Sequence, residues 1–264
     1  MVIKFLLDQI NIKKWNNMDS TIIELADKLI KYVDECSIEL SRDMVIHSND
    51  SKDGFLIQAS LSLFNIGMEQ TKAVAICSKE GYASAARTCL RALMELTLDV
   101  RLMLEYGNSH ENAVRFLCLG SLELKKMLQK DSSDNIEFIK SIDKDLKEYR
   151  ELFPIAITEI ENNFSSNIHK HWSGLSYKQR LSKIKGGTFD GLNTVYGILS
   201  WDAHGRLAYH RSKFNVKDGR LTIKSVEDED SSYFDKIINS AGIIFNSLSS
   251  AIFSSPFISE KPRT

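Results

Sequence analysis

Proline and glycine are scarce in this chain. Only 3 prolines and 13 glycines occur among its 264 residues, about half of the share that is usual in globular proteins. An all-β sandwich or barrel needs many turns built from these two residues, so the composition argues against both folds. Proline breaks helix interiors, and residues 1–153 contain none. The expected fold is therefore all-α, a multi-helix bundle of long helices.

Long apolar runs and paired cysteines are also missing. No uncharged apolar stretch reaches the ~18 residues of a membrane span, and the short apolar start ends at Asp8. We therefore expect a cytoplasmic protein with no membrane partner. The four cysteines, Cys36, Cys77, Cys89 and Cys118, are widely spaced, so core thiols are expected rather than disulfides or a metal site. No nucleotide or metalloprotease motif occurs, and no cofactor is expected.

Apolar residues recur at helical spacing over most of the chain. This periodicity predicts helices at about 19–47, 53–79, 82–106, 109–130, 134–152, 155–166, 177–184, 191–204 and 231–253. Asp218-Gly219 lies between two β-prone runs and predicts a small β-hairpin insert near 214–224. The simplest division is an N-terminal segment 1–18, a single helical domain 19–255 whose part 165–224 is basic and loop-rich, and a C-terminal tail 256–264.

Positive charge is concentrated in one segment, although the net charge of the chain is -1. Residues 169–224 contain eleven Lys or Arg and three Asp, together with four of the six histidines and two of the three tryptophans. Such a segment suits phosphate contacts and base stacking, or it packs against the acidic remainder of the protein. Under the first interpretation, the nucleic-acid-binding residues are Lys178, Arg180, Lys183, Lys185, Arg211 and Lys213.

The predicted helix 82–106 carries a polar stripe. Arg87, Arg91, Glu95 and Asp99 are each four residues apart and therefore share one face of a helix that is otherwise apolar. One interpretation is an ordinary ion pair between Arg91 and Glu95 on a solvated face. The other is a pocket in which Arg91 binds an anion and Glu95 orients it or acts as a base.

A second group of polar residues surrounds the end of the predicted helix 191–204. Tyr196, Ser200 and His204 precede Gly205 and are followed by Arg206 and His210. A histidine at a helix C-terminus is favoured in its charged form by the helix dipole. Either His204 caps the helix, or it takes part in proton transfer. Ser200 lacks the glycine-bounded turn of a hydrolase nucleophile.

Three motifs together resemble a known family. They are Arg91-Ala-Leu-Met-Glu95, Trp172-Ser-Gly-Leu-Ser176 and Tyr196-Gly-Ile-Leu-Ser-Trp-Asp-Ala-His204-Gly205. Their order and spacing resemble an uncharacterised bacterial all-helical domain family over roughly residues 50–255. More distantly, the chain is similar to the HEPN superfamily of antiviral and toxin–antitoxin proteins. Many HEPN proteins are dimeric, metal-independent ribonucleases with an Arg-x(4–6)-His site; here Arg206 and His210 are separated by three residues.

The resemblance implies a HEPN-like effector of bacterial antiviral defence or toxin–antitoxin type that cleaves or binds RNA without a metal. His204 or His210 would then transfer protons, and Arg91 or Arg206 would stabilise the phosphate. We expect Arg91, Glu95 and His204 to meet in one pocket. The supporting residues would be Arg87, Trp172, Tyr196 and Ser200.

Other interpretations remain open. The first is a non-catalytic helical module that binds a protein partner or a nucleotide signal. The second is a metal-dependent hydrolase with His169, His171 and His210 as ligands, in a region that has few acidic residues. The expected partners are RNA, a protein partner of a defence or antitoxin system, and further copies of the chain in a homo-oligomer.

Overall fold

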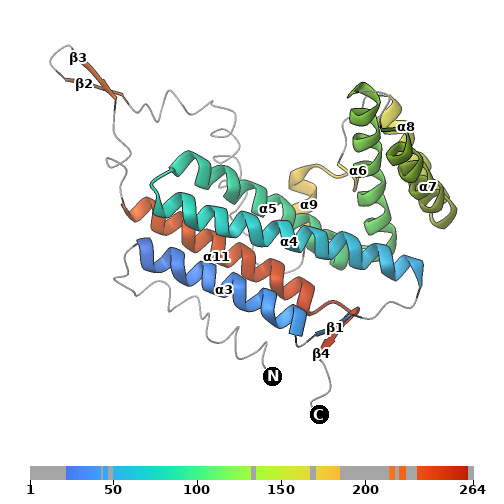
Figure 1. Ribbon diagram of the computed structural model, residues 1–264, viewed down its shortest axis with the longest axis horizontal. Coiled ribbons are helices and arrows are strands. Elements are labelled where there is room, and N and C mark those ends of the chain that lie inside the picture. The colour runs from blue at the N-terminus through green and yellow to red at the C-terminus, as the bar shows by residue number, and fades with distance from the viewer. Residues whose placement is uncertain are drawn as a thin grey trace.

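The protein is built mainly from long helices (Figure 1). The structure, a computed structural model, describes residues 22–42, 44–46, 50–131, 135–166, 171–184, 214–217, 220–223 and 231–260. Within them the helices are α3 (Ile22–Arg42), α4 (Ser51–Lys79), α5 (Ala83–Glu105), α6 (Ser109–Asp131), α7 (Ile136–Leu152), α8 (Pro154–Ser165), α9 (Tyr177–Lys183) and α11 (Ser231–Phe253). The all-α prediction is confirmed. The predicted helix 191–204 and the segment 1–18 lie outside the described residues.

Local sequence signals explain where the helices begin and end. The Asp50 side chain accepts a hydrogen bond from the Asp53 N–H and so caps the start of α4. Gly81 and Gly107 follow α4 and α5 with positive φ angles of 76° and 69°, which favour glycine. Pro154 occupies the first turn of α8, where its missing N–H costs nothing. These signals place most predicted boundaries within two residues of the observed ones.

The prediction was wrong at the end of the first helix. α3 ends at Arg42, and Met44–Ile46 form strand β1, which pairs antiparallel with β4 (Ile258–Glu260). The predicted helix 19–47 was thus too long, and the predicted tail 256–264 contains a strand. A strand of three residues is too short to show alternation, and its partner lies at the other end of the chain.

The predicted hairpin is confirmed. Strand β2 (Phe214–Lys217) pairs antiparallel with β3 (Arg220–Ile223), and Lys217 faces Arg220 across the ladder. This register leaves two residues for the connection, as the Asp218-Gly219 signal predicts. The connecting residues themselves lie outside the described ranges.

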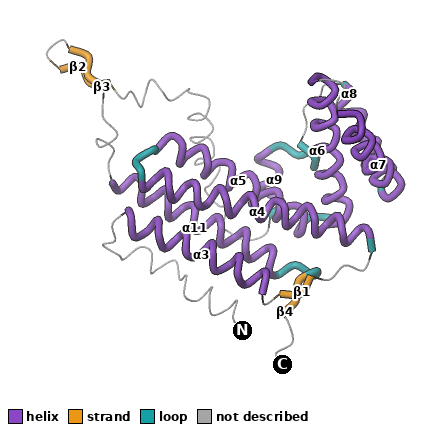
Figure 2. Tube along the Cα trace, in the orientation of Figure 1, coloured by secondary structure: helices purple, strands orange, loops and turns teal. Residues whose placement is uncertain are grey.

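Helices α3, α4, α5 and α11 pack side by side and enclose the main core (Figure 2). α4 contacts the other three and also α6, which explains why it is apolar on nearly all sides. Phe64 of α4 stacks on Phe245 of α11 with ring centroids 5.8 Å apart. Tyr32 of α3 meets the same phenylalanine ring edge-on at 5.6 Å.

Helices α6, α7 and α8 form an arm with a second, smaller core. Val114, Cys118, Ile142, Leu146 and Ile157 fill it, and each is at most 5% exposed. All four cysteines of the chain are free thiols. Burial raises the pKa of Cys36 and of Cys118 to about 12, so both remain protonated core groups at neutral pH. Among the described helices, none has the length and apolar character needed to cross a membrane.

Gly67 allows α4 and α11 to approach closely. A Cβ atom at this position would lie 2.3 Å from Cδ2 of Leu248, which is fully buried. We predict that Gly67→Ala lowers the free energy of unfolding by about 1–3 kcal/mol through overpacking, despite the better helix propensity of alanine. Urea denaturation measures the change.

Gly120 of α6 provides the matched control, because nothing lies within 4 Å of a Cβ placed there. Gly120→Ala should stabilise the protein by up to about 1 kcal/mol through helix propensity alone. Equal effects of the two substitutions would contradict the close approach at Gly67.

Candidate functional site on helices α5 and α9

The polar stripe of α5 lies at the edge of the main core rather than on a fully solvated face. Arg87 is only 5% exposed, and the side chains of Arg91 and Glu95 are 21% and 38% exposed. Arg91 Nε donates a hydrogen bond of 3.0 Å to Glu95 Oε1. The stripe therefore contains a half-buried ion pair, and its last member, Asp99, lies one turn further along the same face.

Asp99 is the centre of a cluster of polar side chains, which we call the Asp99 cluster: Asp99, His171, Ser173 and Arg180. Asp99 Oδ1 accepts hydrogen bonds from His171 Nε2 at 2.8 Å and from Arg180 Nη1 at 2.9 Å. The side chains of these three residues are 15%, 19% and 10% exposed. Charge-assisted hydrogen bonds in such a half-buried place are stronger than those on the surface.

The hydrogen bonds of His171 define its tautomer. The backbone N–H of Ser173 donates to His171 Nδ1 at 3.2 Å, and the Ser173 Oγ lies 2.7 Å from the same nitrogen. Since a backbone N–H can only donate, Nδ1 is the unprotonated acceptor and Nε2 carries the hydrogen that Asp99 receives. Arg180 Nη1 also lies 2.9 Å from Nε2. His171 Nε2 and Arg180 Nη1 both donate to Asp99 Oδ1, so the two nitrogens lie close together because they share this acceptor.

Residues 171–184 form a turn followed by a short helix, and this local structure places His171, Ser173 and Arg180 in the Asp99 cluster. Gly174 has a φ of 70°, and its N–H donates to the His171 carbonyl oxygen at 2.8 Å, which closes a turn. Ser176 and Gln179 then form a reciprocal capping box that begins α9. The sequence Trp-Ser-Gly-Leu-Ser thus encodes a turn followed by a helix start.

The same segment lies between α5 and α6 and contacts both helices (Figure 1). Trp172 is 3% exposed and meets Phe116 of α6 edge-on, with ring centroids 6.4 Å apart. Lys183 at the end of α9 places its Nζ 5.2 Å from the centre of the Tyr106 ring, which follows α5. The segment 171–184 is therefore held near its start by α6 and near its end by the residue that follows α5.

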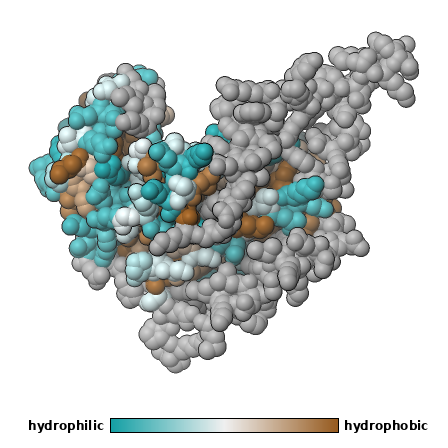
Figure 3. Space-filling view, turned by 180° about the vertical axis from the view of Figure 1, so that it is seen from behind, coloured by the Kyte–Doolittle hydropathy of each residue, from teal (hydrophilic) through white to brown (hydrophobic). Residues whose placement is uncertain are grey.

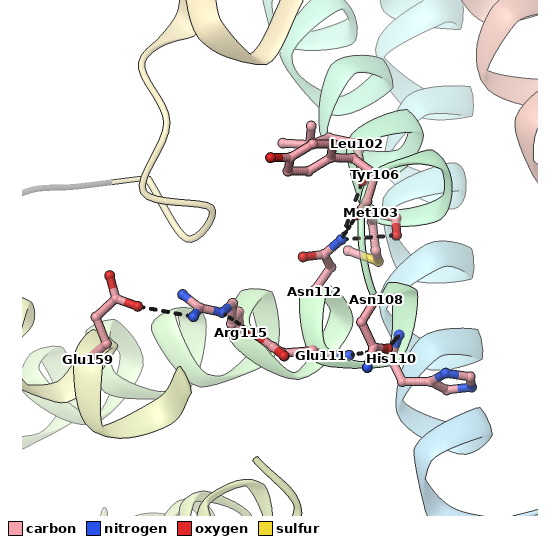
Figure 4. A network of polar contacts seen from close by, with 9 residues as sticks. All are labelled: Leu102, Met103, Tyr106, Asn108, His110, Glu111, Asn112, Arg115 and Glu159. Carbon is pink, nitrogen blue, oxygen red and sulfur yellow. Dashed lines mark hydrogen bonds and ion pairs between the residues drawn. The ribbon is translucent and has the colours of Figure 1, made fainter. Parts of the chain in front are cut away.

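Two asparagines fix the corner between α5 and α6 (Figure 4). Asn108 caps the start of α6, because its Oδ1 accepts from the N–H groups of His110 and Glu111. Asn112 Nδ2 points back to the end of α5 and donates to the carbonyl oxygens of Leu102, Met103 and Tyr106. One turn further along α6, Arg115 bridges to Glu111 and Glu159. The angle that places Phe116 near Trp172 is thus held by hydrogen bonds to helix ends.

The predicted site residues occupy different places. Arg91 and Glu95 contact each other, Trp172 is buried beside the Asp99 cluster, and Lys178 and Lys183 are exposed on α9. The other predicted residues lie outside the described ranges: Lys185, Tyr196, Ser200, His204, Arg206, His210, Arg211 and Lys213. The meeting of Arg91 and Glu95 with His204 therefore stays a prediction.

Arg180 requires a correction. Its charge predicts a place on a nucleic-acid-binding surface, but the residue is 8% exposed and its guanidinium donates to Asp99. Its positive charge pairs with the Asp99 carboxylate inside the protein, where an unpaired carboxylate would be costly. Arg180 consequently anchors α9 instead of facing a ligand in solvent.

The sequence patterns predict no site role for Asp99 or Ser173, and they predict His171 only as a metal ligand. The sequence does contain one signal for Asp99, which is its position at the end of the polar stripe on an otherwise apolar helix. A half-buried carboxylate at such a position needs hydrogen-bond donors. Nothing in the spacing indicates that these donors come from residues 72 and 81 positions later. Within the described part of the chain, no group of three or more His, Cys, Asp or Glu residues is arranged to hold a metal ion.

Removing Asp99 should destabilise the protein far more than removing an exposed acid. Asp99→Ala leaves the buried Arg180 guanidinium without this acceptor, so we predict a loss of about 3 kcal/mol in the free energy of unfolding. Asp27→Ala, which breaks an exposed pair with Lys79, should cost at most ~1 kcal/mol. Urea denaturation of both variants measures the difference. Equal losses would mean that the Asp99 cluster does not anchor the segment.

Comparison with known proteins places the chain in one family. Residues 58–220 match a family described as being of unknown function, DUF5677. The matched range includes the stripe of α5 and the Trp172-Ser-Gly-Leu-Ser176 segment. No curated protein and no solved structure matches the chain. The expected relation to an uncharacterised helical family is confirmed, and because the match covers well over half of the sequence, the chain belongs to the DUF5677 family of unknown function.

Proposed function

We propose that the protein is a HEPN-like helical effector of bacterial antiviral defence or toxin–antitoxin type that binds RNA and cleaves it without a metal ion. The observation that carries the proposal is the docking of α9 on α5. This docking holds a basic helix in a fixed position on α5, through Asp99, on the same helix face that carries the half-buried Arg91–Glu95 pair.

The exposed face of α9 has the chemistry of a single-stranded RNA contact. Lys178 and Lys183 are exposed, and Tyr177 and Tyr106 lie next to cationic side chains. Tyr106, which follows α5, is 39% exposed, and Lys183 lies over one face of its ring. Lysines bind backbone phosphates, whereas aromatic rings stack on unpaired bases, and their combination is typical of single-strand binding.

Cleavage requires a proton-transfer group and a cation near the phosphate. Arg91 is oriented by its hydrogen bond to Glu95, so its guanidinium can stabilise charge that develops on a phosphate in the transition state. The proposed proton-transfer residue is His204 or His210, with Arg206 as a second cation. RNA with its own 2′-hydroxyl then supplies the nucleophile, and no metal ion is needed.

A second candidate function is supported by apolar side chains on the arm. Met127, Ile136 and Phe138 are 63%, 56% and 61% exposed near the turn between α6 and α7. Figure 3 shows apolar patches on the surface of the arm among hydrophilic side chains. Exposed apolar residues of this size mark protein-interaction surfaces. They favour a helical module that binds a protein partner or another copy of the chain.

The RNA-binding proposal is tested by charge reversal on α9. We predict that Lys178→Glu with Lys183→Glu weakens binding of single-stranded RNA at least tenfold and lowers the slope of log K against log salt by about 1.4, since each phosphate contact contributes about 0.7. Filter binding over a salt series measures both quantities. The control is Lys140→Glu with Lys144→Glu on exposed positions of α7. A loss that is equal in the two double variants would contradict a specific contact at α9.

The cleavage proposal is tested in cells. Induced expression of the wild-type chain in bacteria should arrest growth, and His204→Ala should relieve the arrest, because a metal-free ribonuclease loses its proton-transfer group. Culture density and total RNA integrity after induction measure the effect. A binding module predicts no arrest from either protein. Arrest that persists in the His204→Ala and His210→Ala variants, with intact RNA, would contradict cleavage.

A further inference from the structure

Three residues of the Asp99 cluster form a continuous chain of hydrogen bonds. The Ser173 Oγ lies 2.7 Å from His171 Nδ1, and His171 Nε2 lies 2.8 Å from Asp99 Oδ1. A hydroxyl, an imidazole and a carboxylate in this order have the relation of nucleophile, general base and orienting acid. Arg180 donates to the same carboxylate oxygen and so fixes its position.

We propose that Ser173, His171 and Asp99 form a catalytic triad in which Ser173 is the nucleophile of an acyl-transfer reaction on carboxylic esters. The proposal goes beyond the RNA function and does not depend on it. The unprotonated Nδ1 of His171 lies closer to the Ser173 hydroxyl, at 2.7 Å, than to the Ser173 backbone N–H that it also accepts, at 3.2 Å, so it is placed to act as a general base toward the hydroxyl. The Leu175 N–H donates to Ser173 Oγ at 3.3 Å, so the hydroxyl hydrogen is left to point at Nδ1.

Two unpaired donors beside this triad are explained by the same proposal. Among the residues that the structure describes, Trp172 Nε1 and Arg180 Nε have no hydrogen-bond partner, and they belong to residues that are only 3% and 8% exposed. Both side chains contact His171: the indole centroid lies 5.0 Å from the imidazole centroid, and Arg180 Nη1 lies 2.9 Å from Nε2. A buried donor without an acceptor costs about 1–3 kcal/mol. In this proposal, an acceptor carried by the substrate, such as the oxyanion of a tetrahedral intermediate, would supply the missing partner.

The surroundings define the substrate class. Phe116 and Trp172 place apolar rings beside the triad, and Leu175 follows Ser173 at the edge of the main core. An apolar acyl group fits these neighbours. A neutral ester also approaches the Asp99 carboxylate without the repulsion that an anionic phosphodiester experiences. Ser173 itself is only half-buried.

The reaction balances without a cofactor or an oxidant. Ser173 Oγ forms a bond to the ester carbonyl carbon while its proton passes to His171 Nδ1, and Asp99 stabilises the resulting imidazolium through Nε2–H. The bond from carbon to the alcohol oxygen then breaks, and the Nδ1 proton goes to the leaving alkoxide. Water next attacks the acyl-serine and gives its proton to Nδ1. Release of the carboxylic acid returns that proton to Ser173 Oγ.

A fluorophosphonate probe tests the proposal directly, because an activated serine displaces fluoride and forms a stable Oγ–P bond. Peptide mass spectrometry of the labelled full chain should find the adduct on Ser173, and the protein should hydrolyse p-nitrophenyl acetate. His171→Gln retains a hydrogen-bonding side chain but cannot accept the proton, so labelling and hydrolysis should fall at least ~100-fold. Ser173→Ala should abolish both, and circular dichroism establishes that each variant is folded.

Ser182→Ala is the matched control, because this serine of α9 is exposed and its hydroxyl donates to the Gln179 carbonyl oxygen within the same helix. Its labelling and hydrolysis should equal those of the wild type. Absence of the adduct from the wild-type chain, or equal labelling of the His171→Gln variant, overturns the proposal and leaves the hydrogen bonds of Ser173 as a structural turn. Neither result affects RNA binding by α9, which is measured separately.

Discussion

One carboxylate oxygen, Asp99 Oδ1, joins two parts of the chain that are far apart in sequence. It accepts from His171 and Arg180, which lie 72 and 81 residues later, and so attaches residues 171–184 to α5. A half-buried charge is costly unless its hydrogen bonds are satisfied, and here the acid and the guanidinium compensate each other. The position of α9, its exposed lysines and the orientation of His171 all follow from this shared acceptor.

The rest of the fold makes α5 a rigid support for that contact. α4 and α11 pack along α5, where Leu93 and Met94 are completely buried. At the far end, the asparagine caps of the α5–α6 corner determine where Phe116 meets Trp172. The main core therefore positions Asp99, and the corner positions the tryptophan that precedes Ser173. The hydrogen bonds of the Asp99 cluster form between these two positions.

Features that depend on neighbouring residues could be predicted from the sequence, whereas features that depend on residues far away in the sequence could not. Helices were predicted well because periodicity, glycine at positive φ and capping residues act within a few positions. Strand β1 was missed because three residues show no alternation and its partner β4 lies at the opposite end of the chain. The stripe of α5 followed from spacing alone, and the Arg91–Glu95 bond is local. Arg180 was misplaced on the surface because charge suggests exposure, whereas burial depends on Asp99.

The account depends most directly on the energetic coupling between Asp99 and Arg180. A double-mutant cycle of Asp99→Ala and Arg180→Ala, measured by urea denaturation, isolates it. Because each single variant leaves a half-buried partner unsatisfied, the double variant should be more stable than the sum of the single losses indicates, with a coupling energy of about 2–3 kcal/mol. Losses that add to within about 0.5 kcal/mol would show that the two side chains act independently. The shared carboxylate would then not be what holds α9 in place.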